Sequence, residues 1–169
     1  CAIVTGVQTC ALPISLFKTY SDKDDEEAVA TVIKRGTYWA AGPEIEKFEA
    51  MVADYVGRKY GVAVNSGTSA LHCLLESIDV REKEVIVPSF TFIATANAVI
   101  LAGGVPVFAE SEEDTFGLDI ESVKENITSR TAAILNVDYA GFISRDTEKL
   151  MALADEKGIE YLEDAAEAL

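Results

Sequence analysis

The chain has 169 residues, a length that favours one domain, and its 14 basic and 29 acidic residues give a formal net charge of −15. This acidity argues against the basic face that a nucleic-acid binder or a protein docked on an anionic membrane requires. Apolar residues make up 49% and charged residues 25%, which is typical of a globular domain. No apolar run approaches the roughly 20 residues of a membrane span. Three cysteines do not make a disulfide framework, and with no secretory signal we expect a reducing, cytoplasmic location.

Residues 1–14 differ in character from the rest of the chain. They lack the basic start and the small-residue cleavage site of a secretory signal, and they show no clean periodicity. Residues 4–14 resemble the translation of a sequencing-adapter oligonucleotide. We therefore expect residues 1–14 to be a non-native leader, and the alternative is a native strand over residues 2–4.

Residues 15–58 predict an N-terminal helical segment. Ser21 followed by Asp24 is typical of a capping box, and Gly36 marks the end of the helix that follows. Pro43 is placed as the first residue of a second helix, which Gly57 ends.

Residues 59–169 alternate between short apolar runs and helical patterns. We predict strands at 60–64, 84–88, 105–109, 132–137 and 159–162, and helices at 69–78, 94–102, 120–127 and 147–157. Continuous apolar strands that alternate with helices indicate a parallel sheet covered on both faces. The predicted fold class is therefore α/β, in three layers, with a mostly parallel sheet flanked by helices.

Ligands bind at the carboxyl ends of the strands in such sheets, so the residues at these ends are candidate site residues. After the strand predicted at 60–64, Gly67 lets an anion approach the backbone and Thr68 adds a hydroxyl donor. A helix N-terminus also presents unpaired N–H groups and a partial positive charge, so this turn predicts a phosphate site. The alternative is an ordinary turn in which Ser66 caps the helix.

Two further strand ends carry aromatic side chains and a carboxylate. Phe90 and Phe92 follow the strand at 84–88, where one ring can lie against a planar ligand and the other can belong to the core. Asp164 follows the strand at 159–162, where it can pair with a protonated ring nitrogen or else cap a helix. Together the three strand ends predict a flat, phosphorylated, protonatable heterocycle, and pyridoxal 5′-phosphate (PLP) has these properties.

Three segments carry a resemblance to a known family. Residues 65–72 (NSGTSALH), 85–99 (VIVPSFTFIATANAV) and 163–168 (EDAAEA) resemble the DegT/DnrJ/StrS-type sugar aminotransferases, which belong to the fold-type-I PLP-dependent enzymes. The likeness runs from about residue 16 to residue 169, and its motifs are long, ordered and correctly spaced. It implies the large, PLP-binding domain of an aminotransferase.

The resemblance also implies a role for individual residues. Gly67 and Thr68 match the family's contacts with the cofactor phosphate, and Phe92 matches the aromatic residue that stacks on the pyridine ring. Asp164 matches the catalytic acid that pairs with the ring nitrogen. Glu167 stands where the family often carries Gln, near the phenolic oxygen of the cofactor. No metal site is implied.

The implied chemistry is transamination. The family transfers an amino group from an amino acid, usually glutamate, to a keto group of a nucleotide-linked sugar, for amino-sugar or cell-surface polysaccharide biosynthesis. Its members are usually homodimers. The resemblance therefore implies a nucleotide-linked keto sugar, an amino-acid donor and a second copy of the chain as partners, with no nucleic acid and no membrane.

The family's Schiff-base lysine has no counterpart here, because it lies further along than the five residues that follow Asp164. We therefore expect the chain to be an N-terminal fragment in which residues 59–169 form an incomplete PLP-binding domain, inactive by itself. Relatives that carry histidine in place of that lysine are sugar dehydratases, which leaves this activity as an alternative. A non-catalytic, ligand-binding relative is another. A nicotinamide-dependent oxidoreductase is disfavoured because the Gly-x-Gly-x-x-Gly pattern is absent.

Overall fold

The computed structural model describes residues 19–168, which fall into two compact units that meet in sequence between Glu46 and Lys47. The leader expected at residues 1–14, and its alternative as a strand, lie outside the described residues. The first unit contains helix α1 (Lys23–Arg35) and the beginning of α2 (Pro43–Tyr55). The second unit contains all the strands and positions the candidate site.

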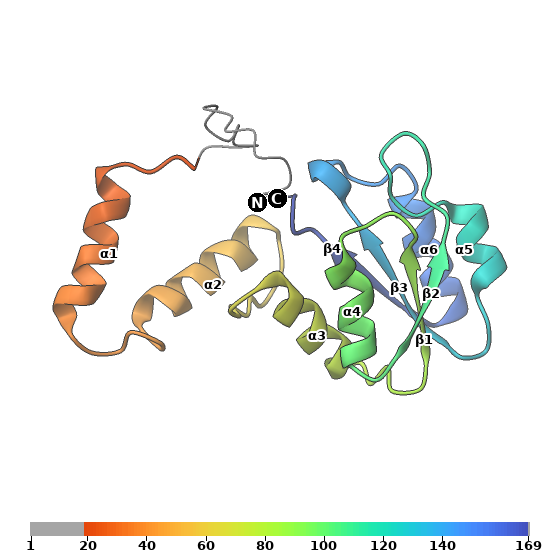
Figure 1. The fold of residues 1–169 in the computed structure, drawn as a ribbon, viewed down its shortest axis with the longest axis horizontal. Coiled ribbons are helices and arrows are strands. Elements are labelled where there is room, and N and C mark those ends of the chain that lie inside the picture. The colour runs from red at the N-terminus through yellow and green to blue at the C-terminus, as the bar shows by residue number, and fades with distance from the viewer. Residues whose placement is uncertain (1–18, 169) are drawn as a thin grey trace, which may run out of the picture. The chain divides into compact units, whose positions relative to one another are not determined.

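The second unit is built on a four-stranded, fully parallel sheet in the order β2-β1-β3-β4 (Figure 1). Its strands are β1 (Glu84–Pro88), β2 (Val105–Ala109), β3 (Thr131–Val137) and β4 (Glu160–Asp164). The chain first moves from β1 to β2 at one edge and then returns past β1 to β3 and β4. The strand order therefore reverses between β1 and β3, which is where α/β sheets form a crevice for ligands.

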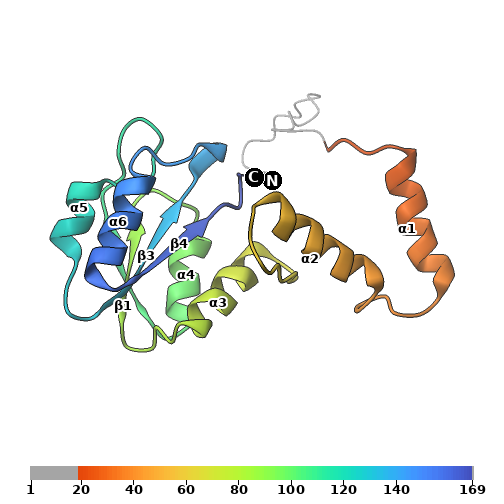
Figure 2. The same ribbon diagram turned by 180° about the vertical axis from the view of Figure 1, so that it is seen from behind.

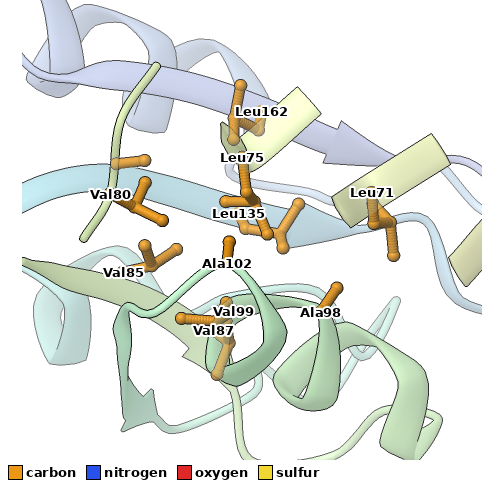
Figure 3. Packing of buried hydrophobic residues seen from close by; sticks show 11 residues of the cluster. Leu71, Leu75, Val80, Val85, Val87, Ala98, Val99, Ala102, Leu135 and Leu162 are labelled. Carbon is orange, nitrogen blue, oxygen red and sulfur yellow. The ribbon is translucent and has the colours of Figure 1, made fainter. Parts of the chain in front are cut away.

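Helices cover both faces of the sheet, which confirms the predicted three-layer α/β fold (Figure 2). On one face, Val85, Val87 and Leu135 pack against α3 (Gly67–Ser77) and α4 (Ile93–Leu101) (Figure 3). On the other face, Ile86 and Ile134 pack against α5 (Ile120–Asn126) and α6 (Thr147–Lys157). Successive side chains of β1 and β3 enter opposite layers, so both strands are continuously apolar.

Helix α1 begins one residue later than the predicted capping box implies. Asp22, not Ser21, is the N-cap, and its carboxylate accepts hydrogen bonds from the N–H groups of Asp24 and Asp25. The Asp25 side chain in turn accepts the Asp22 N–H at 3.0 Å, so the box is Asp22–Asp25. The physical reason is that a carboxylate adds a favourable charge at the positive end of the helix dipole. Gly36 ends the helix in the left-handed conformation, as predicted.

The prediction of a strand at residues 60–64 is wrong. The segment pairs with no strand among residues 19–168, and both Tyr60 and Val62 are exposed. Instead, the N–H of Ala63 donates to Oε1 of Glu49 at 2.8 Å. A β-rich composition forms a strand only beside a pairing partner, and no such partner exists in this part of the chain.

The remaining elements follow the predicted pattern with shifts of one or two residues at their ends. Strand β4 is the most consequential shift, because it runs to Asp164 and so includes a residue that was expected to follow the strand. The short 3₁₀ turn η1 (Tyr139–Gly141) follows β3 directly. Among the described residues, none of the helices has both the length and the apolar composition that crossing a membrane would need.

Candidate functional site

A cavity of about 520 Å³ lies at the carboxyl ends of β1, β3 and β4, next to the N-terminus of α3. This volume is within the range of small-molecule sites. It includes the point at which the strand order reverses. The lining residues come from four separate segments and are Gly67, Thr68, Leu71, Phe90, Thr91, Phe92, Ala94, Val137, Asp138, Tyr139, Asp164, Ala166 and Glu167. All five residues that the sequence analysis singled out for the cofactor are among them.

The N-terminus of α3 forms the part of the cavity whose backbone groups could bind an anion. Ser66 is the N-cap, and its Oγ accepts the N–H of Ser69 at 3.1 Å. The N–H groups of Gly67 and Thr68 have no helical carbonyl four residues earlier to donate to, because the first helical bond runs from the Ala70 N–H to the Ser66 carbonyl, and so they remain available to a ligand. A Cβ built on Gly67 would have no neighbouring heavy atom within 4 Å, so open space lies beside this backbone. The Ser66 cap that was posed as an alternative is present, and it leaves the N–H groups of Gly67 and Thr68 free.

Two aromatic side chains after β1 have different surroundings. The Phe90 ring lies in an aromatic cluster, with its centroid 5.6 Å from that of Phe116 and 4.8 Å from that of Tyr139. Phe92 is the N-cap residue of α4, is 74% exposed and also lines the cavity. Phe92 therefore has a free ring face that a planar ligand could cover, whereas Phe90 forms part of the wall.

Asp164 is the last residue of β4, and both of its carboxylate oxygens accept hydrogen bonds. Oδ2 accepts from the Thr95 hydroxyl at 2.9 Å, and Oδ1 accepts from the Ala166 N–H at 3.3 Å. The chain then turns, and no helix begins at Asp164 within the described residues. The alternative role as a helix cap is therefore not observed.

Asp138 is a cavity residue that the sequence analysis did not single out. It directly follows β3, is 5% exposed, and its Oδ1 accepts the Ser144 N–H at 3.2 Å. Burial raises the pKa of Asp138, and the nearby charge of Asp164 raises it further against the opposing effect of the Ser144 N–H. A carboxylate after a buried strand was the available signal, because the same reasoning was applied to Asp164.

Glu167 connects two strand tips. Its Oε2 accepts the N–H of Ala140 at 2.8 Å, and Ala140 has a positive φ of 55°. The adjacent Gly141 has a φ of 82°, and a Cβ there would lie 2.9 Å from the backbone oxygen of Glu167. The turn that carries Tyr139 to the cavity wall is therefore held by the segment after β4.

The cavity contains no candidate for a covalent link to an aldehyde. None of the lysines in residues 19–168 lines it. The side chains present can bind a phosphate, cover a ring and hold a proton, but they do not supply an amine.

The family model of the DegT/DnrJ/EryC1/StrS aminotransferase family matches residues 19–169. GDP-perosamine synthase of Vibrio cholerae is 32% identical over 157 residues, which cover 92% of this chain and 42% of that protein. Among solved structures, the aminotransferase from Psychrobacter cryohalolentis is 34% identical with a TM-score of 0.85, over 93% of this chain and 40% of that one. NtdA from Bacillus subtilis, solved with bound pyridoxamine 5′-phosphate (PMP), is 31% identical with a TM-score of 0.80.

The match to NtdA covers 88% of this chain and 35% of that protein, so the chain spans about two fifths of the length of these relatives. The matched residues include every segment that lines the cavity. Sequence, fold and cavity therefore agree, and the chain belongs to the DegT/DnrJ/EryC1/StrS aminotransferase family.

Proposed function

We propose that this chain contributes the cofactor site of a PLP-dependent aminotransferase that moves an amino group from an amino acid, glutamate, to a keto group of a nucleotide-linked sugar. One observation carries the proposal: a helix N-terminus, an exposed aromatic ring and a carboxylate from three distant segments line one cavity. The family match and the likeness to GDP-perosamine synthase support the reaction and the substrate class.

The groups that line the cavity fit PLP in their chemistry. The free N–H groups at the start of α3 and the Thr68 hydroxyl suit a phosphate, because the helix dipole favours an anion there. Gly67 leaves the space that a close approach of phosphate to the backbone needs. Phe92 offers a ring face to a planar heterocycle. Asp164 offers a carboxylate to a protonated ring nitrogen.

Each residue then has a defined task. Gly67 and Thr68 bind the phosphate and fix one end of the cofactor, and Phe92 restricts the tilt of its ring. Asp164 holds a proton at the ring nitrogen. When bound, the cofactor supplies the electron sink for the reaction. Glu167 also lines the cavity, and the family resemblance implies that it would lie near the phenolic oxygen of the cofactor.

We extend the proposal to the organisation of the protein. Residues 15–58 form an N-terminal helical segment, and residues 59–169 form part of the cofactor-binding domain. The protein acts as a homodimer in the cytoplasm, in amino-sugar or cell-surface polysaccharide biosynthesis. The relative GDP-perosamine synthase is named after a nucleotide-linked sugar, and this name supports the proposed substrate class.

The test is binding of PMP to the chain, since PMP needs no lysine. We expect saturable binding, measured by equilibrium dialysis and by the absorption of the bound ring. Asp164→Ala and Thr68→Val should each weaken it by at least about tenfold, the effect of losing one hydrogen bond to a charged group. Thr131→Val is the matched control, because Thr131 is buried at the other end of β3. A wild-type chain that retains no PMP contradicts the proposal.

A second measurement examines the covalent chemistry. Because none of the lysines in residues 19–168 lines the cavity, borohydride reduction of the chain with PLP should leave no single lysine specifically labelled. Peptide mapping by mass spectrometry reads this out. One stoichiometrically modified lysine would show that the chain holds an amine at the cofactor after all.

A further inference from the structure

Asp164 is held by a chain of hydroxyl groups that extends from the cavity wall into the protein. Thr95 lies in α4, is 0% exposed, and its Oγ1 is 2.9 Å from Oδ2 of Asp164. The Oγ1 of Thr91, which lines the cavity, is 3.0 Å from Oγ1 of Thr95. Three side chains from two segments that are far apart in sequence are therefore linked.

The chemistry of the groups fixes the direction of these hydrogen bonds. An ionised carboxylate has only acceptors, so the single proton of the Thr95 hydroxyl points to Asp164. Thr95 can then only accept from Thr91, which must donate its own proton. The order is Thr91 to Thr95 to Asp164, and each hydroxyl is fixed by the next.

The buried face of α4 gives no packing reason for a hydroxyl at this position. The other buried residues of the helix are Ala96, Ala98 and Val99. A threonine inside a helix commonly bonds its hydroxyl to the carbonyl four residues earlier, but the partners of Thr95 are Asp164 and the Thr91 side chain. A valine of the same shape would fill the space, so the hydroxyl serves the carboxylate.

We propose that Thr95 is a positioning residue for Asp164, and that Thr91 orients Thr95. The inference rests on the proposed function, in which Asp164 holds the proton of the cofactor ring nitrogen. Thr95 occupies one lone pair of Oδ2 and the Ala166 N–H occupies one of Oδ1, which fixes the plane of the carboxylate. Asp164 also lines the cavity, so a ring nitrogen bound there would meet a carboxylate that is already held in place.

The experiment compares Thr95→Val, Thr95→Ser and the control Thr131→Val in the full chain. Thr131 is also buried, and its hydroxyl accepts the Thr128 N–H at 2.9 Å, but it lies outside the cavity. Side-chain NMR couplings of Asp164 without cofactor should show one rotamer in wild type and Thr95→Ser, and rotamer averaging in Thr95→Val. Thr131→Val should keep the single rotamer.

PMP binding gives the second readout. Thr95→Val should bind PMP about tenfold more weakly, and the ring of the bound PMP should lose its proton at a lower pH, seen in its absorption. Thr95→Ser should restore both properties, and Thr131→Val should change neither. If Thr95→Val does not fold, Thr91→Val tests the same chain of hydroxyl groups. It should lower the PMP affinity and the pH at which the ring loses its proton, each by less than Thr95→Val.

The outcomes separate the inference from the proposed function. A single Asp164 rotamer in Thr95→Val, or unchanged PMP binding and ring titration, overturns the positioning role. A uniform loss of affinity with no change in the ring titration also overturns it. If wild type binds no PMP but Asp164 loses its fixed rotamer only in Thr95→Val, the proposed cofactor is wrong and the positioning role stands.

Discussion

Two groups of carboxylates in the second unit differ in how their charge is balanced. In the Arg145 cluster, Arg145 makes ion pairs with Glu112, Asp114, Asp119 and Asp146, at N–O distances from 2.8 to 3.8 Å. In the cavity cluster, made of Asp138, Asp164 and Glu167, no lysine or arginine of residues 19–168 forms an ion pair. The difference separates carboxylates whose charge is balanced by Arg145 from carboxylates that have no cationic partner among residues 19–168.

The pKa of Asp138 in the cavity cluster is shifted in the opposite direction from those of Glu112 and Asp146 in the Arg145 cluster. Burial alone would raise the pKa of Glu112, but hydrogen bonds from Thr115 and from two backbone N–H groups, with the charge of Arg145, hold it below its ordinary value. The pKa of Asp146 is likewise lowered, because bonds from Lys149 and Arg145 outweigh burial. In the cavity cluster, burial raises the pKa of Asp138. A carboxylate with a raised pKa beside a cavity is typical of functional sites.

The largest expected effect comes from breaking the Arg145 cluster at its buried acid. Glu112 is 4% exposed and accepts the N–H groups of Asp114 at 2.7 Å and Thr115 at 2.9 Å. Glu112→Ala leaves these donors without partners and should lower the free energy of unfolding by about 3 kcal/mol. The neighbouring, exposed Glu113 is the control, and Glu113→Ala should change it by less than about 0.5 kcal/mol. Equal losses in urea unfolding would contradict this distinction.

Acid should destabilise the protein through the Arg145 cluster. The folded-state pKa values of Glu112 and Asp146 lie below the ordinary values of 4.5 and 3.8. Their stabilisation is therefore fully present above these ordinary values and is lost as the pH falls through the lowered ones. The urea midpoint should decrease steeply in that acidic range, and Glu112→Gln should decrease less steeply. An identical pH slope in this variant would show that Glu112 is not a source of acid sensitivity.

Asp138 of the cavity cluster should make the stability depend on pH with the opposite sign. The pKa of Asp138 is raised above its ordinary value of 3.8, so the folded state holds this proton more tightly than the unfolded chain. The contribution of Asp138 to stability is present below pH 3.8 and is lost as the pH rises through the raised pKa. Asp138→Asn keeps an oxygen acceptor for the Ser144 N–H and removes the charge. The variant should raise the free energy of unfolding at neutral pH. The increase should be smaller than the decrease caused by Glu112→Ala, and it should vanish in acid.

Glu112→Gln and Asp138→Asn are informative as a pair, because the two carboxylates should make the stability depend on pH with opposite signs. If Asp138→Asn destabilises the protein at neutral pH, the negative charge of Asp138 is favourable in the folded state, as it is for Glu112. Thermal unfolding at several pH values measures both variants with one method.

Sequence patterns predicted the second unit well because its signals are local. The apolar run of β1 and the amphipathic pattern of α6 depend on residues that are close in sequence, and both elements have the predicted bounds. The segment at 60–64 has an equally strong β-composition but forms no strand among the described residues. Composition gives the preference for extended backbone, whereas hydrogen bonding to a neighbouring strand decides the outcome.

In the candidate site, too, some features could be predicted from local sequence and others could not. Gly67, Thr68, Phe92 and Asp164 were found because each follows or begins an element that sequence can locate, whereas Glu167 was found through the family resemblance. Their assembly around one cavity follows from parallel topology. The hydrogen bonds to Asp164 and Ala140 were beyond reach, because the partners are 69 and 27 residues apart in sequence. Such contacts depend on the packing of α4 and of the β3 turn, which no local pattern specifies.

The smallest expected effect concerns Glu167, which belongs to the cavity cluster but binds a backbone N–H. Glu167→Gln keeps an oxygen that can accept the Ala140 N–H, so the free energy of unfolding should be unchanged. Glu167→Ala removes the acceptor from a turn with positive φ at both Ala140 and Gly141, and should cost about 1 kcal/mol. Hydrogen exchange at the Ala140 amide should be faster in Glu167→Ala only. Faster exchange in both variants would show that charge, rather than the hydrogen bond, holds the turn, and would place Glu167 closer in kind to the Arg145 cluster.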